Sequence, residues 1–155
     1  QINVVLEREN YAYRIINDLI NDIEIKSIQE SLESNDLKGI QEHISSALQK
    51  LSDRKNQDFR NSIKESISAI EVLIRNITNK NTLGDGIKEL KNKNYITIPN
   101  ILNEELIKLY SYTNNKEDGI RHCIMDESNV NFEEAKFMLV ACCNFINYIK
   151  IKLKG

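Results

Sequence analysis

The strongest constraint on the fold of this chain is the spacing of its bulky apolar residues between positions 59 and 77. From Phe59 onward a row of them is spaced by three or four positions, which places the row on one face of an α-helix. The members of this row are Phe59, Ile63, Ile67, Ile70, Ile74 and Ile77. A row so narrow predicts a long helix packed against a partner helix, with Asp58 able to cap its first turn.

Helical spacing recurs on both sides of this segment. A short helix is expected from about residue 24 to residue 35, and Asp36 can cap the next, whose apolar residues are Leu37, Ile40, Ile44, Leu48 and Leu51. His43 falls on the polar side of that helix and is expected to be exposed. Thr82 can cap a short helix that contains Gly84 and Gly86. Pro99 fits the first turn of another, with the apolar face Ile101, Leu102, Leu106, Leu109 and Tyr110.

The start of the chain has a different pattern. Tyr11 to Ile16 and Leu19 to Ile25 have the composition of short strands, and Asn17 and Asp18 between them favour a turn. We therefore predict a mainly α fold, an antiparallel helical bundle with a small N-terminal β-hairpin. Residues 1–25 are interpreted as the tail of a missing upstream domain and residues 26–155 as the helical domain. Because the first residue is Gln1, the chain is expected to be part of a longer protein.

The last predicted helix is the most apolar. Asn131 can cap it, and Glu134 stands where a capping box closes. Its middle, FMLVACCNFINYI, is apolar nearly all round, which indicates either a helix surrounded by others or one with a second face buried in a dimer. Lys150, Lys152 and Lys154 follow at its C-terminal end, where cations are favourable to the helix dipole.

Composition limits the classes of partner. The net charge is −2, from 21 basic and 23 acidic residues, which argues against a broad DNA-binding face and leaves room for a local RNA site. The three cysteines have no Cys-x-x-Cys spacing, so reduced thiols in the cytoplasm are expected, with no zinc and no cofactor. The longest apolar run, Phe137 to Cys143, is too short to cross a bilayer.

One stretch without periodicity stands out between Ser111 and Val130. Loops of this length inside compact domains are usually functional or disordered. At its centre lies DGIRHCIMDE, from Asp118 to Glu127, in which Arg121 is followed directly by His122. A histidine can carry a proton near neutral pH, and an arginine can bind phosphate oxygens through a planar fork of donors.

The second half of the chain resembles a known family. The segments that carry the resemblance are RNSIKESISAIEVLIRNIT, TLGDGIKEL, LIKLYSYTN and DGIRHCIMDESNVNFEEAKFMLVACCNFINYI. Together they are similar to the C-terminal helical region of bacterial abortive-infection proteins, the AbiJ-related group within the HEPN-like superfamily. The resemblance implies a helical bundle that often dimerises, acts in phage defence and frequently cleaves RNA without a metal.

The resemblance also implies a site. Active HEPN proteins carry an arginine and, a few residues later, a histidine; Arg121 matches the arginine, whereas positions 126 to 128 hold Asp, Glu and Ser. Either His122 has taken over the role of the histidine, or the module is weak or inactive as a nuclease. The long helix of such proteins often presents a polar residue to the site, and Glu71 would fill that place. An ordinary surface pair between Glu71 and Arg75 is the alternative.

The same charged residues allow plainer interpretations. Arg121 can pair with neighbouring carboxylates, and His122 can hydrogen-bond to the loop backbone. A Mg²⁺ ion held by the acidic residues is another alternative, but the spacing of these residues shows no ordered set of ligands. We therefore expect a phage-defence module in which Arg121 and His122 cleave RNA and Glu71 supports them. Whether the module is active as an enzyme is left open by the sequence. The alternative is a non-catalytic dimerisation or sensing module that regulates an upstream domain. Either would be expected to form a homodimer.

Overall fold

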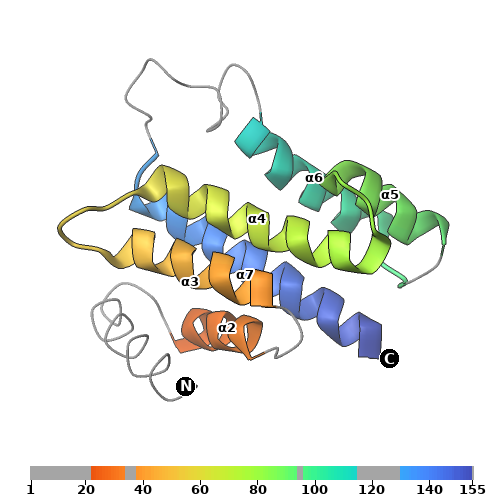
Figure 1. Cartoon of the computed structure of the whole chain (residues 1–155), viewed down its shortest axis with the longest axis horizontal. Helices are drawn as coiled ribbons and strands as arrows, with labels where there is room; N and C mark the ends of the chain where they lie inside the picture. The colour runs from red at the N-terminus through yellow and green to blue at the C-terminus, as the bar shows by residue number, and fades with distance from the viewer. Residues whose placement is uncertain (1–21, 34–37, 94–95, 115–129, 155) are drawn as a thin grey trace.

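The structure, a computed structural model, describes residues 22–33, 38–93, 96–114 and 130–154. Within these ranges the chain forms six helices and no strand, which confirms the mainly α class (Figure 1). The helices are α2 (Asp22–Leu32), α3 (Lys38–Ser52), α4 (Phe59–Thr78), α5 (Leu83–Asn92), α6 (Asn100–Asn114) and α7 (Phe132–Lys154).

The predicted N-terminal hairpin lies almost entirely outside the described residues. Its second strand was expected to end at Ile25, but the chain is already helical from Asp22, so that prediction is wrong for its last four residues. The reason is tertiary: Ile25, Ile28 and Leu32 follow helical spacing and pack against the core. Burial of this row outweighs the local strand preference of the isoleucines.

Helix α4 is the central element of the core. Its isoleucine row is buried as the spacing predicts, with Ile63, Ile67, Ile70 and Ile74 all at 0–1% exposure. It packs against α3 on one side and α7 on another (Figure 1). Helix α3 runs antiparallel to α4, whereas α7 starts at the same end as α4 and runs alongside it (Figure 1). The bundle is therefore not antiparallel throughout, because α4 and α7 run in the same direction (Figure 1).

The ends of α4 are defined by local hydrogen bonds. The Asp58 carboxylate accepts from the backbone N–H of Asn61 at 3.1 Å, as expected of an N-cap. At the other end Asn79 adopts a left-handed conformation with φ 56°, and its N–H donates to the carbonyl of Arg75 at 2.7 Å. Asparagine is one of the few residues that tolerate this conformation, so the helix stops where the sequence permits it.

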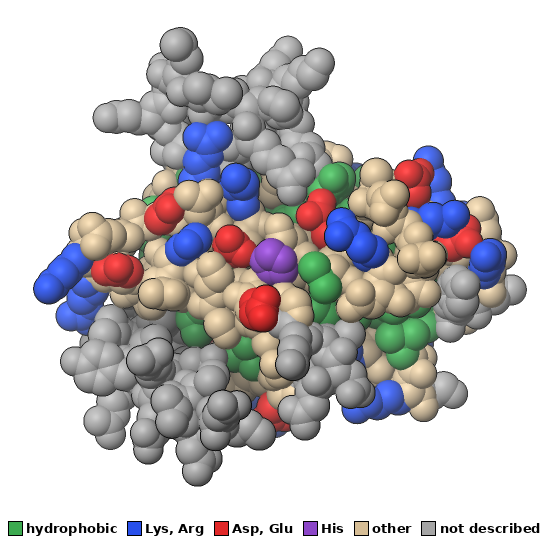
Figure 2. Space-filling model, viewed as in Figure 1, with side chains coloured by type: hydrophobic (Ala, Val, Ile, Leu, Met, Phe, Trp, Pro, Cys, Tyr) green, Lys and Arg blue, Asp and Glu red, His purple; other side chains and the backbone are tan. Residues whose placement is uncertain are grey.

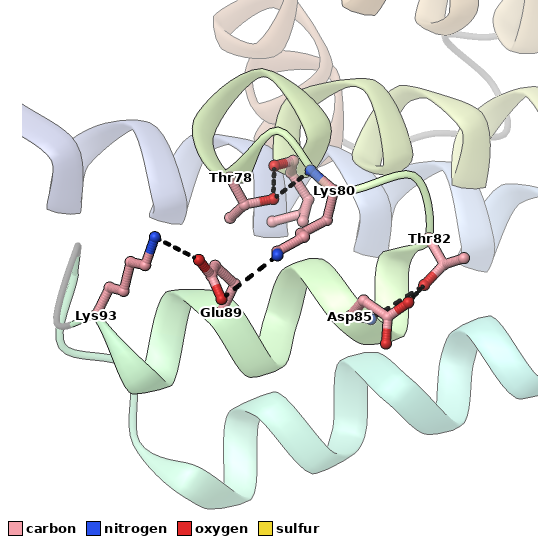
Figure 3. Close-up of polar contacts among 7 residues, drawn as sticks. Thr78, Lys80, Thr82, Asp85, Glu89 and Lys93 are labelled. Atoms are coloured by element: carbon pink, nitrogen blue, oxygen red, sulfur yellow. Dashed lines mark hydrogen bonds and ion pairs between the residues drawn. The ribbon is translucent and has the colours of Figure 1, made fainter.

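The turn from α4 into α5 is tied by side chains (Figure 3). Thr82 caps α5 by accepting from the N–H of Asp85 at 3.1 Å, and its hydroxyl donates to the Asp85 carboxylate at 2.7 Å. One carboxylate oxygen of Glu89 accepts a hydrogen bond from the Lys93 ammonium at 2.8 Å. The other lies 3.8 Å from the ammonium of Lys80, a residue of the turn itself. The hydrogen bond from Lys93 is the main reason why the pKa of Glu89 is lowered.

Helix α5 approaches α4 closely at one point, and a glycine makes the approach feasible. A β-carbon on Gly86 would lie 2.3 Å from Cγ2 of Ile74 and 3.1 Å from Oγ1 of Thr78. A β-carbon on Gly84 would meet nothing within 4 Å. Both glycines weaken the helix in isolation, but only Gly86 is required by packing.

Helix α6 is held to the bundle by few side chains. Of its apolar residues only Leu106 is fully buried, at 2% exposure, while Leu109 and Tyr110 are half-buried. Ile101 was predicted on the packed face but is 66% exposed. Ile101 lies on the first turn of α6, about 140° around the helix from Leu106. Because Leu106 faces the core, Ile101 faces solvent.

Helix α2 is attached to α7 by polar contacts around one buried isoleucine. Ile28 is 0% exposed and is the only apolar residue of α2 within the core. The Ser31 hydroxyl donates to the thiol of Cys143 at 3.3 Å, and the Lys150 ammonium donates to the Ser31 carbonyl at 2.9 Å. Asn147 donates to the carbonyl of Ser27 at 2.8 Å. Lys150, expected only to favour the helix dipole, thus also holds α2.

Candidate functional site

The proposed catalytic pair, Arg121 and His122, lies outside the described residues. The structure does describe where the chain leaves for this segment and where it returns. Burial and, as the smaller cause, the negative charge of Glu134 on α7 raise the pKa of Tyr112, which lies near the end of α6. Phe132 packs edge-on against Phe59, with ring centroids 6.1 Å apart and an angle of 76° between the rings. The return end of the segment is thus fixed near the start of α4.

The return point is set by the capping box expected from the sequence. The Asn131 side chain accepts from the backbone N–H groups of Glu133 and Glu134, at 3.0 and 3.3 Å. The Glu134 carboxylate in turn accepts from the N–H of Asn131 at 3.2 Å. Both donors and acceptors of the motif are satisfied, which fixes the first residue of α7.

Glu71, the third proposed site residue, is half-buried on α4. It lies twelve residues after Phe59, which is roughly 18 Å along the helix axis. Glu71 therefore lies well away from Phe132, where the chain returns from the segment with Arg121. Its part in a site with Arg121 remains a prediction. Arg75, one turn further along, is exposed.

A histidine that the sequence predicted to be merely exposed has an acidic partner. His43 Nδ1 of α3 lies 2.6 Å from Oε2 of Glu65 on α4, with both side chains about one third exposed. Figure 2 shows this histidine, in purple, on the surface formed by α3 and α4 with acidic side chains beside it. The pair could not be predicted from local spacing, because its members are 22 positions apart in the sequence. The one indication was that each residue lies beside the apolar row of its own helix, and these two helices pack together.

This pair is best explained as a polar side-chain contact that joins two helices at the surface. Such pairs contribute about 0.2–1 kcal/mol to stability. Within the described ranges no three histidine, cysteine, aspartate or glutamate side chains come together to hold a metal ion. The pair therefore has no third ligand on the described surface.

The two adjacent cysteines of α7 are core residues. Cys142 and Cys143 are both 0% exposed and not joined in a disulfide. Burial raises the pKa of the Cys143 thiol to about 12 and that of Cys142 well above its usual value. A buried thiol of this kind is a poor nucleophile at neutral pH, because the reactive form is the thiolate.

The most unusual surface of the described residues is a row along α7. Phe137 is 62% exposed and Ile151 is 69% exposed, although both are large apolar residues. Between them Ala141 and Tyr148 are half-buried and Asn144 is exposed. These five residues, Phe137, Ala141, Asn144, Tyr148 and Ile151, step by four, three, four and three positions, and we call them the α7 seam. This alternation is the spacing of a helix face that packs against another helix.

No described helix is long and apolar enough to cross a membrane. Comparisons with protein-family models, with curated proteins and with solved structures found no match. The function of this chain must therefore be argued from its own residues. The α7 seam and the attachment points of the segment with Arg121 are the features of the described residues that bear on it.

Proposed function

We propose that this chain is a non-catalytic dimerisation module, which regulates a domain upstream of it in a bacterial phage-defence protein. The observation that carries the proposal is the exposed apolar row of the α7 seam. The sequence left two explanations for an apolar last helix: full enclosure by other helices, or a second face buried in a dimer. Exposure of Phe137 and Ile151 in the single chain favours the second.

The seam has the properties of an interface rather than of scattered surface residues. Single exposed apolar side chains are common on soluble proteins, but contiguous patches usually mark interaction sites. Here the apolar residues share one face of one helix, over roughly 21 Å of its length. Aromatic residues such as Phe137 and Tyr148 are also the types enriched in protein interfaces.

The oligomeric state of the purified chain tests this proposal. We expect sedimentation equilibrium to give a mass that rises with concentration from that of the 18.0 kDa monomer toward that of the dimer. Lysozyme of similar size, run in the same buffer, controls for non-ideality. A chain that stays monomeric at the highest attainable concentration contradicts the proposal.

A second candidate function is RNA cleavage by Arg121 and His122, supported by where their segment is attached. The end at which the chain returns from this segment lies near the first turns of α4, which also carry the basic residues Arg60 and Lys64. Arg60 and Lys64 are cations that could contact phosphate, and Asp58, Glu133 and Glu134 bring negative charge to the same end. In such a reaction His122 would take the proton from a ribose hydroxyl, while Arg121 would stabilise charge on the phosphate.

Point variants test the nuclease directly. If the chain cleaves RNA in the presence of a chelator, we expect Arg121→Ala and His122→Ala each to lower the rate by about 100-fold or more, because each removes one catalytic group. Fluorescent single-stranded RNA is the substrate to follow. His43→Ala is the matched control, since it removes the other histidine of the chain, which pairs with Glu65, and it should leave the rate unchanged. Equal cleavage by all variants, or none by the unmodified chain, contradicts this candidate.

A further inference from the structure

From the charge pattern of α7 we infer that two copies of this chain pair through their α7 seams in antiparallel orientation. This inference rests on the proposed dimerisation and names its partner, a second copy, and its geometry. It uses the side chains at the two ends of the helix as well as those of the seam.

The charges at the ends of α7 are opposite in sign. Its first turn carries Glu133 and Glu134, and its last turn carries Lys152 and Lys154. An antiparallel pair places the acidic end of each helix beside the basic end of the other. A parallel pair places glutamates beside glutamates and lysines beside lysines, which is unfavourable. The helix dipoles favour the antiparallel pair as well.

The seam residues are compatible with this orientation. In an antiparallel pair that aligns the charged ends, Phe137 of one copy faces Tyr148 and Ile151 of the partner subunit near each end of the contact. Ala141 and Asn144 then meet at the centre, where the small alanine lets the helices approach. Two aromatic contacts related by a two-fold axis would supply most of the apolar burial.

Asn144 gives the contact a polar centre. Its side-chain oxygen already accepts a hydrogen bond from Ser27 of α2 at 2.5 Å, so its orientation is set within the chain. A polar residue in the middle of an apolar seam lowers affinity but fixes how the helices align. The same hydrogen bond links the seam to α2, so docking of α2 and pairing of α7 involve the same residue.

The surroundings of the seam suit a contact with a second helix. Tyr148 is covered on one side by Lys152, whose ammonium lies 5.7 Å from the ring centroid. The opposite face of α7 is fully used by the bundle, with Met138, Leu139, Cys142 and Ile146 at 0–1% exposure. The seam is therefore a separate face of the helix, available without disturbing the core.

Phe137→Glu tests whether the seam is the interface. We expect it to weaken dimerisation by about 30-fold or more in sedimentation equilibrium, because it removes an aromatic contact and brings in a charge. Circular dichroism should show an unchanged helix content, since Phe137 is exposed. Ile101→Glu is the matched control: Ile101 is 66% exposed on α6, close to the 62% of Phe137, and its replacement should leave dimerisation unchanged.

Charge reversal tests the orientation. Glu133→Lys should weaken the dimer, and adding Lys154→Glu in the same chain should restore it, because the two positions face one another only in the antiparallel pair. Failure of the double variant to recover overturns the antiparallel geometry. A dimer that persists in Phe137→Glu overturns the seam while leaving the proposed dimerisation intact. A strictly monomeric unmodified chain overturns both.

Discussion

Replacing Gly86 by alanine is expected to destabilise the protein by about 2–3 kcal/mol, even though alanine is the better helix former. The added β-carbon would lie 2.3 Å from Cγ2 of Ile74, a methyl group branched directly from the β-carbon of a buried side chain. This methyl cannot swing away as the end of a long side chain can, so α5 must move off α4. Urea denaturation followed by circular dichroism measures the change in the free energy of unfolding.

Gly84→Ala is the matched control for this prediction. It lies two residues away in the same helix, and its added β-carbon would meet nothing within 4 Å. Helix propensity then acts alone, and we expect Gly84→Ala to stabilise the protein by about 0.5–1 kcal/mol. If both variants shift stability in the same direction, the close approach of α5 to α4 is not as described.

Replacing Ile28 by alanine is expected to cost about 2–4 kcal/mol and to act mainly on α2. Ile28 is the single fully buried apolar residue of that helix, so its removal takes away most of the apolar contact that holds α2 on α7. The remaining contacts are those of the half-buried Ile25 and Leu32 and the hydrogen bonds of Ser27 and Ser31 to α7. Hydrogen exchange should therefore show the amides of α2 losing protection before those of α4.

Ile23→Ala provides the control, because Ile23 lies in the same helix and is 82% exposed. It should change stability by no more than about 0.5 kcal/mol. A uniform loss of protection across all helices in Ile28→Ala would mean that α2 unfolds only together with the whole bundle. Equal effects of the two substitutions would contradict the burial of Ile28.

Much of the fold could be predicted from the local spacing of apolar and capping residues. The row from Phe59 to Ile77 predicted a buried helix face, and the caps at Asp58, Thr82 and Asn131 are confirmed at the hydrogen-bond level. These features depend on residues a few positions apart. Within a helix, separation along the sequence determines separation in space. Helix content could be predicted for the same reason.

Features that join distant parts of the chain could not be predicted in this way. Nothing local relates His43 to Glu65, and nothing in the composition of α5 separates Gly86, which is pressed against Ile74, from Gly84, which is not. The parallel course of α4 and α7 depends on how α5 and α6 turn the chain. Arg121 and His122 were proposed from sequence alone, and they lie outside the described residues.

The two helices on either side of residues 115–129, α6 and α7, are attached to the bundle by very different amounts of buried apolar surface. Helix α7 buries seven residues, whereas α6 relies on Leu106 and a few half-buried neighbours. Local opening costs least where few apolar groups are buried, so α6 can separate from the bundle while α7 stays in place. A ligand or partner that displaces α6 would then leave undisturbed the helix on which two copies are proposed to meet.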